Sequence, residues 1–245
     1  MKERESLDLL GIKPIGEAIS AATKAAIDAA SAFLGRICLP AAEEFGLLIR
    51  DKISFWRLKN FLKISEKAEN LLKMNPDFEL KHSHPRLVFS ILEHGSWSED
   101  STVQDMWAGL LASSCTSGGE DDSNLIFINL LSHLTKSQAR LLKFSCECSG
   151  KYVERPGLIM VGQFVIKLNT LFKVMEIDDI NIIDRELDHL RSLGLIVGGI
   201  IPEKDDSADI TPTALALYMY VRCQGSKDSP VDYFKLEQGY CTLPS

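Results

Sequence analysis

The sequence lacks the short motifs that identify most catalytic and phosphate-binding sites. It contains no Gly-x-Ser-x-Gly elbow, no glycine-rich phosphate loop and no His-Glu-x-x-His helix. Its carboxylates are spread over the expected helix faces. His94 follows Glu93 near an expected helix C-terminus, where the helix dipole favours a cation, so capping explains it better than acid–base catalysis. We therefore expect a non-enzymatic protein with no cofactor.

Paired metal-ligand motifs and an export signal are missing as well. The six cysteines have neither the spacing of a disulfide framework nor that of a zinc site. Cys146 with Cys148, and His82 with His84, are single pairs, whereas a zinc site needs two. The charged N-terminus lacks the apolar run of a secretory signal. These absences predict no bound metal and a cytoplasmic location.

Positive charge is scarce. The chain has 27 lysines and arginines against 34 acidic residues, and its net charge is −7 at pH 7. A protein whose main task is to grip phosphate backbones needs a positive surface. The composition therefore argues against nucleic acid as the main partner.

Helical periodicity is the strongest signal that is present. In residues 103–112, apolar side chains recur at i, i+3, i+4, i+7 and i+8, which is typical of a helix with one face in a core. They are Val103, Met106, Trp107, Leu110 and Leu111. Ser83 followed by Pro85 predicts a helix start, residues 117–122 an exposed acidic loop, and Thr135 with Gln138 a capping box. The predicted fold class is mainly α, with a multi-helix body.

Residues 15–39 predict an alanine-rich amphipathic helix. Its expected apolar stripe is Ile15, Ala18, Ile19, Ala22, Ala26, Ala29, Ala30, Phe33 and Ile37. Glu17, Lys24 and Asp28 interrupt the stripe well before the ~20 apolar residues of a membrane span. Because alanines let helices approach closely, we expect this face to pack on a partner helix. Peripheral contact with the inner membrane is the alternative.

The C-terminal part predicts a winged-helix-like module with a small β-hairpin. Asp178 or Asp179 is expected to cap a helix that ends at Gly194. The inward residues of this helix are Ile183, Leu187 and Leu190. Residues 195–201 and a return strand from Ile210 predict the hairpin, and Thr211 before Pro212 predicts the next helix start. The expected segments are long N-terminal helices at 1–75, a helical core domain at 76–150, the winged-helix-like module at 151–225 and a tail at 226–245.

The charges of this module favour protein over DNA as its partner. The residues near the would-be recognition helix are Glu176, Asp178, Asp179, Asp184, Glu186 and Asp188 against Arg185 and Arg191. The expected wing has Glu203, Asp205, Asp206 and Asp209 against Lys204. Such surfaces repel phosphates. We take Asp184, Arg185, Asp188 and Arg191 as the candidate interaction surface.

Five segments carry a resemblance to a known family. They are residues 39–46 (LPAAEEFG), 55–60 (FWRLKN), 66–69 (EKAE), 104–112 (QDMWAGLLA) and 134–142 (LTKSQARLL). In this order they resemble the abortive-infection alpha family, a bacterial group linked to phage defence, and the resemblance covers about residues 15–224. The family-motif core is expected at Trp56, Trp107, Leu110 and Leu111, and we expect Trp97 to fill a core or inter-helix gap. The family has no agreed catalytic residues, so none is carried over.

The resemblance implies a part in phage defence. The protein would be a sensor that binds a phage or host protein, or a toxic effector held off until infection. Three classes stay open: a protein-interaction component, which we favour; a membrane-perturbing effector acting through residues 15–39; and a winged-helix DNA-binding regulator. Assembly into a homo-oligomer is compatible with each.

Overall fold

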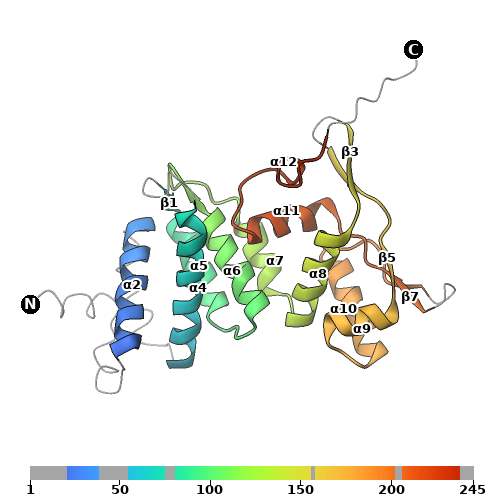
Figure 1. Ribbon diagram of the computed structural model, residues 1–245, viewed down its shortest axis with the longest axis horizontal. Helices are drawn as coiled ribbons and strands as arrows, with labels where there is room; N and C mark the ends of the chain where they lie inside the picture. Colours follow the sequence, from blue (N-terminus) through green and yellow to red (C-terminus); the bar gives the residue numbers. More distant parts are fainter. Residues whose placement is uncertain (1–20, 39–54, 75–80, 156–157, 202–205, 238–245) are drawn as a thin grey trace, which may run out of the picture. The chain divides into compact units, whose positions relative to one another are not determined.

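A computed structural model describes residues 21–38, 55–74, 81–155, 158–201 and 206–237. Contacts between residues divide the chain into two compact units (Figure 1). The first unit contains residues 1–132 with 223–225, and the second contains 133–222 with 226–245. The boundary between the two units therefore follows Ser132.

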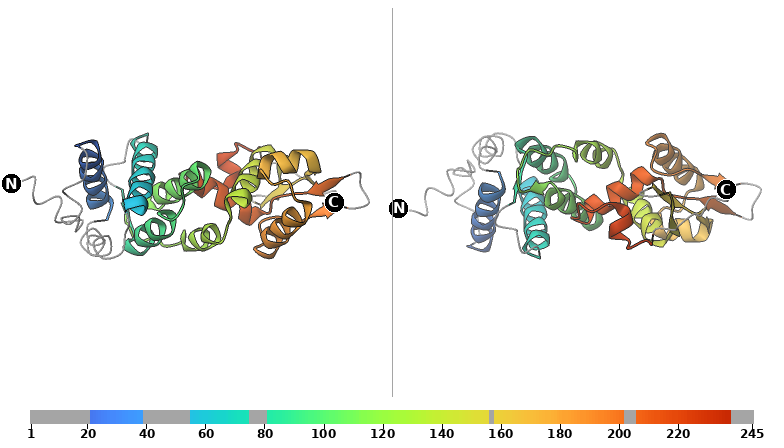
Figure 2. Two further views of the ribbon diagram at one scale, coloured as in Figure 1. Left: turned by 90° about the horizontal axis from the view of Figure 1, so that it is seen from below. Right: turned by 90° about the horizontal axis from the view of Figure 1, so that it is seen from above.

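The first unit is helical in its described part. Its helices are α2 (Ala21–Ile37), α4 (Phe55–Lys73), α5 (Pro85–Gly95), α6 (Ser101–Ser113) and α7 (Leu125–Ser132). Helix α6 packs against α4, α5 and α7, and α2 packs along α4 (Figure 2). The strands β1 (His82–Ser83) and β2 (Cys115–Thr116) form a short antiparallel pair.

The predicted stripe on α6 is confirmed. Trp107 is 2% exposed, and Leu110 and Leu111 are fully buried. Two glycines allow close packing around this stripe. A Cβ atom on Gly95 would lie 3.0 Å from Cγ of Trp107, and one on Gly109 would lie 1.7 Å from the carbonyl oxygen of Cys223. The α6 core therefore depends on glycine as well as on large apolar residues.

The predicted face of α2 is correct for Ala30, Phe33 and Ile37, which are buried. It is wrong for Ala26 and Ala29, which are exposed. The core position between them belongs to Ile27, a larger side chain that gains more from burial than alanine does. The N-terminal residues of the predicted stripe, Ile15, Ala18 and Ile19, lie outside the described residues, and of Ala22 only the backbone is described.

The start of α5 differs from the prediction by one residue. His84 is the N-cap, because its Nδ1 accepts a hydrogen bond of 3.2 Å from the backbone N–H of Arg86, and Pro85 takes the first helical turn. Ser83, the predicted cap, is buried in β1. The acidic loop at 117–122 is exposed over most of its length, as predicted.

The second unit combines helices with small antiparallel sheets. Its helices are α8 (Lys136–Cys148), α9 (Leu168–Met175), α10 (Ile180–Ser192), α11 (Ala214–Cys223) and α12 (Pro230–Tyr233). Its strands are β3 (Lys151–Arg155), β4 (Leu158–Val161), β5 (Val165–Lys167), β6 (Ile200–Ile201) and β7 (Ser207–Asp209). Strands β3 and β4 form a hairpin, and a second sheet has the order β5-β7-β6. The chain is thus mostly helical with small sheets, as expected.

The predicted hairpin is correct only in part. Strand β6 pairs with β7, but the return strand ends at Asp209, one residue before the predicted start at Ile210. Residues 195–197 form no strand, and Ile196 makes only an isolated bridge to Pro212. The sequence reasoning missed β3, β4 and β5, since these strands are too short to show a period-2 pattern clearly.

Helix capping in the second unit largely follows the prediction. Asp179 caps α10, accepting a hydrogen bond of 2.8 Å from the N–H of Asn181, and Gly194 has the left-handed φ of 69° expected after the helix. The start of α11 is the exception. Thr213 accepts the N–H of Ala216 at 3.2 Å, so Thr213 rather than Thr211 is the cap.

Candidate interaction surface

Helix α10 brings the four predicted surface residues together. Asp184, Asp188 and Arg191 lie at i, i+4 and i+7 and share one stripe. Arg185 lies beside them, and all four side chains are exposed. Nη2 of Arg191 donates to Oδ1 of Asp188 at 2.5 Å, so this arginine is already paired within the helix.

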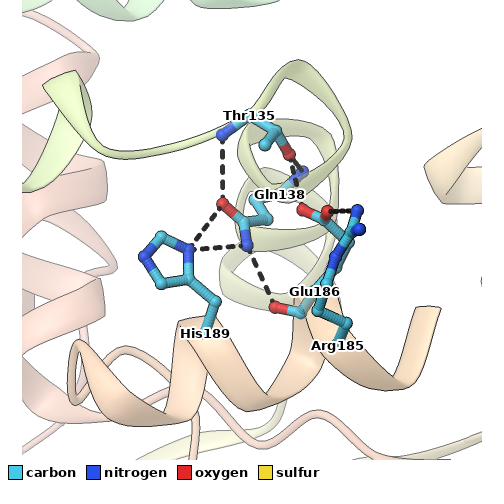
Figure 3. Close-up of polar contacts among 5 residues, drawn as sticks. All are labelled: Thr135, Gln138, Arg185, Glu186 and His189. Carbon is cyan, nitrogen blue, oxygen red and sulfur yellow. Dashed lines mark hydrogen bonds and ion pairs between the residues drawn. The ribbon is translucent and has the colours of Figure 1, made fainter. Parts of the chain in front are cut away.

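Glu186, on the same helix, is buried. It is only 6% exposed, although the sequence counted it among the acids near the surface. The hydroxyl of Thr135 donates to its Oε2 at 2.8 Å, and Nη2 of Arg185 donates to its Oε1 at 2.8 Å (Figure 3). Both carboxylate oxygens therefore have partners, as a buried charge requires. The Arg185 guanidinium is held at Glu186 rather than left free.

Gln138 completes this polar cluster between α8 and α10 (Figure 3). Its Nε2 donates to the backbone oxygen of Glu186 at 3.1 Å, and its Oε1 accepts the N–H of Thr135 at 3.0 Å, which confirms the predicted capping box. The amide also faces Nδ1 of His189, 2.9 Å from Nε2. The cap of α8 thus fixes the neighbouring turn of α10.

The sequence reasoning missed this link between the two helices. A usable signal was nevertheless present, because Glu186 lies three residues after Ile183 and directly before Leu187, on the inward side of the helix. An acidic residue at an inward position needs a donor nearby. The predicted cap at Thr135 supplied one.

Exposed apolar side chains accompany the charged stripe. Ile180 and Ile182 on α10 are 37% and 38% exposed, and Val197 after it is 63% exposed. Asp184 has no ion pair among the described residues, whereas both arginines of the surface have one. The surface therefore combines apolar area with a small surplus of negative charge. The expected wing residues 203–205 lie outside the described part of the chain.

Trp56 and Trp97 are an exposed aromatic pair in the first unit, so the prediction that they lie in the core is wrong. They are 37% and 62% exposed, and their ring centroids are 6.2 Å apart. The inward position belongs to Arg57, whose guanidinium lies 4.1 Å from the Trp97 ring centroid and donates to Oγ of Ser96 at 2.9 Å. Burial lowers the pKa of Arg57, and the nearby carboxylate of Glu93 opposes this effect.

The buried titratable groups of the second unit are suited to packing. Burial raises the pKa of the Cys146 thiol, whereas a nucleophilic cysteine needs a lowered pKa. Burial also raises the pKa of Tyr220, and Glu147, which accepts its hydroxyl at 3.0 Å, raises it further. Burial lowers the pKa of Lys151, whose ammonium lies 4.4 Å from the Phe234 ring centroid. Cys146 and Tyr220 are therefore held protonated.

The described ranges contain neither a cluster of potential metal ligands nor a membrane-spanning helix. No three or more His, Cys, Asp or Glu side chains gather there as a metal site would require. None of the helices in those ranges has the length and apolar character needed to cross a bilayer.

Comparison with known proteins identifies the family. No curated protein and no solved structure matches the chain. The sequence profile described as abortive infection alpha matches residues 57–210, which is more than half of the chain and runs from the first turn of α4 to the end of β7. This match confirms the expected resemblance. The chain belongs to the abortive infection alpha family.

Proposed function

We propose that this protein is a non-enzymatic component of phage defence that acts by binding another protein through the exposed face of α10. Family membership supports the defence role. The observation that carries the binding mode is the outer face of α10, where Ile180 lies on the stripe of Asp184, Asp188 and Arg191, and Ile182 is exposed on the opposite flank beside Arg185. Exposed apolar area rimmed by polar groups is typical of protein contact sites.

The second unit is proposed to be a winged-helix-like module. After α8 and the inserted β3–β4 hairpin, its elements follow the order β5, α9, α10, β6, β7, with β7 central in the three-stranded sheet. In this arrangement α10 takes the place of the recognition helix. This order also favours a second candidate, a DNA-binding regulator.

The ion pairs of α10 support protein over DNA. Arg185 contacts Glu186 and Arg191 contacts Asp188, so each guanidinium already has an acidic neighbour that lowers its attraction for a phosphate. Asp184 adds a negative charge where the DNA backbone would pass. The outer face of α10 therefore offers DNA little net positive charge, and few counterions would be released on binding.

We place the protein in the cytoplasm, with peripheral contact at the inner membrane as the alternative that a membrane-perturbing effector would need. The partner is a phage or host protein with basic and apolar groups that complement α10. A homo-oligomer is compatible with this surface.

The test is the double substitution Asp184→Lys with Asp188→Lys. Both residues are exposed, so the fold should persist, since such substitutions usually change stability by less than ~0.5 kcal/mol. Phage plating on cells that express the variant should rise toward that of cells without the protein. The matched control, Glu120→Lys with Asp122→Lys in the exposed loop before α7, makes the same charge change and should keep defence intact.

Duplex DNA separates the two candidates. The wild type should bind DNA weakly, and the α10 variant should bind it more tightly, with a steeper salt dependence, because repulsion is relieved. Sub-micromolar, sequence-specific binding of DNA by the wild type in physiological salt would overturn the protein-binding proposal and favour the regulator.

A further inference from the structure

A groove runs between α2 and α4 in the first unit. Its volume is about 700 Å³. It is lined by Thr23, Ala26, Ala29 and Ala30 from α2, and by Leu58, Lys59, Leu62, Lys63, Ser65, Glu66, Glu69, Asn70 and Lys73 from α4. This volume is within the roughly 300–1,000 Å³ of small-molecule sites.

The floor of the groove is apolar. Ala26 and Ala29 are exposed although they lie on a helix that packs against a neighbour, because their methyl groups are too short to fill the space beside Leu58 and Leu62. An alkyl chain bound along this floor would shield these surfaces from water. Each buried CH₂ group would stabilise the complex by about 0.8 kcal/mol.

The charges of the groove differ between its two ends. At the C-terminal end of α4, Glu69 is neutralised by Lys73 at 3.1 Å and by Arg36 at 3.6 Å. Toward the N-terminal end, Lys59 and Lys63 are exposed and have no ion pair among the described residues. Glu66 lies one turn from Lys63 and also lines the groove. It too has no ion pair among the described residues. The two lysine ammonium groups without an ion pair therefore lie at the same end of an apolar floor.

Ser65 adds an independent observation. It lines the groove and is 1% exposed, and its hydroxyl has no hydrogen-bond partner among the described residues. A buried hydroxyl without a partner costs about 1–3 kcal/mol. The groove therefore contains a buried polar group whose hydrogen-bond partner is not supplied by the described residues.

We propose that the groove binds a single-chain anionic amphiphile of the fatty-acid class. The alkyl chain would cover Ala26, Ala29 and Leu62, and the carboxylate would lie between Lys59 and Lys63. The two lysines at one end of an apolar floor favour a small anion with an apolar tail over a partner helix, whose polar face would have to lie on the rest of the rim. This site goes beyond the protein-binding surface on α10 and does not depend on it.

The first test uses a fluorescent fatty acid, 11-(dansylamino)undecanoic acid, with the full chain. We expect saturable binding, displacement by palmitate and a rise in the melting temperature with palmitate concentration, since a ligand of the native state stabilises it. The methyl ester of the probe keeps the tail and removes the charge, so it should bind clearly more weakly. Equal binding of acid and ester, or no saturable binding, would overturn the proposal.

Three variants then test the two ends of the ligand. Lys59→Gln with Lys63→Gln should weaken binding of the acid about tenfold, the sum of two partly exposed ion pairs, and leave the ester unchanged. Glu66→Gln should strengthen binding of the acid. Ala26→Leu with Ala29→Leu should fill the floor and abolish binding of both probes, with circular dichroism confirming the fold. The control, Lys136→Gln with Lys173→Gln, makes the same charge change on exposed lysines of the second unit and should alter nothing.

Other occupants of the groove give different results. If the protein floats with anionic phospholipid vesicles but binds no monomeric probe, the groove contacts a membrane and the fatty-acid proposal fails. If the alanine-to-leucine variant loses phage defence while the wild type binds no probe, a protein occupies the groove and the proposal also fails. If the α10 variant loses phage defence but binds the probe normally, the fatty-acid site is supported independently of the α10 surface.

Discussion

Replacing Trp107 by alanine should unfold or strongly destabilise the first unit. The indole is 2% exposed, stacks on His94 with ring centroids 6.2 Å apart, and packs so closely on Gly95 that a Cβ atom there would lie 3.0 Å from its Cγ. Removing about 200 Å² of buried aromatic surface at 25 cal/mol/Å² costs about 5 kcal/mol. Substitutions of this kind usually cost about 3–5 kcal/mol. Domains are stable by about 5–15 kcal/mol in total, so most of the margin would be lost.

Trp56→Ala is the matched control, because it removes the same side chain from a position that is 37% exposed. It should cost clearly less than Trp107→Ala. Urea titrations followed by circular dichroism measure both variants, and the two units allow two transitions, of which only one should move. An unchanged midpoint for Trp107→Ala, or equal losses for both variants, would refute the packing argument.

Three further outcomes follow from contacts in each unit. Gly109→Ala should destabilise the first unit by about 1–3 kcal/mol or more, because the new Cβ atom would collide with the carbonyl oxygen of Cys223. A melting temperature at or above that of the wild type would contradict this. Thr135→Ala should destabilise the second unit more than Glu186→Ala, since it removes the N-cap of α8 and leaves a carboxylate oxygen of buried Glu186 without its donor; thermal melts compare them. Because the pKa of Tyr220 is raised in the folded state, its contribution is fully present below about pH 10 and is lost above it. The gap in melting temperature between wild type and Tyr220→Phe should therefore shrink as the pH rises from 9 to 11.

The helices could be predicted because their signals are local and repeated. The α6 stripe, the capping box at Thr135 and the inward face of α10 each rest on several residues at helical spacing, and each is confirmed. The strands could not be located well, because β5 and β6 are three and two residues long and owe their place to pairing with β7. Short strands carry little periodicity of their own.

The candidate site shows a different limit. Spacing correctly predicted that Asp184 and Asp188 share an exposed stripe, but it could not show that Arg185 and Arg191 are engaged in ion pairs. The tryptophans show the same limit, because a large apolar residue is expected inside and only the structure reveals that Arg57 takes the inward place of Trp56. The sequence shows which side chains are present, whereas the exposure of each side chain depends on contacts between residues far apart in the sequence.

These contacts change the electrostatic argument about α10. Counted along the sequence, the helix has more acids than bases, which would repel any anion equally. In the structure, Glu186 is buried and neutralised by Arg185, so the net charge of the outer face depends on fewer groups than the sequence suggests. Asp184 is then the main carrier of the surplus charge, and Ile180, one turn before it on the same stripe, supplies apolar area. A partner that binds this face must complement both groups. Asp184→Asn should therefore weaken partner binding, and Ile180→Ser should weaken it more than Asp184→Asn does, an order that a purely electrostatic contact would reverse.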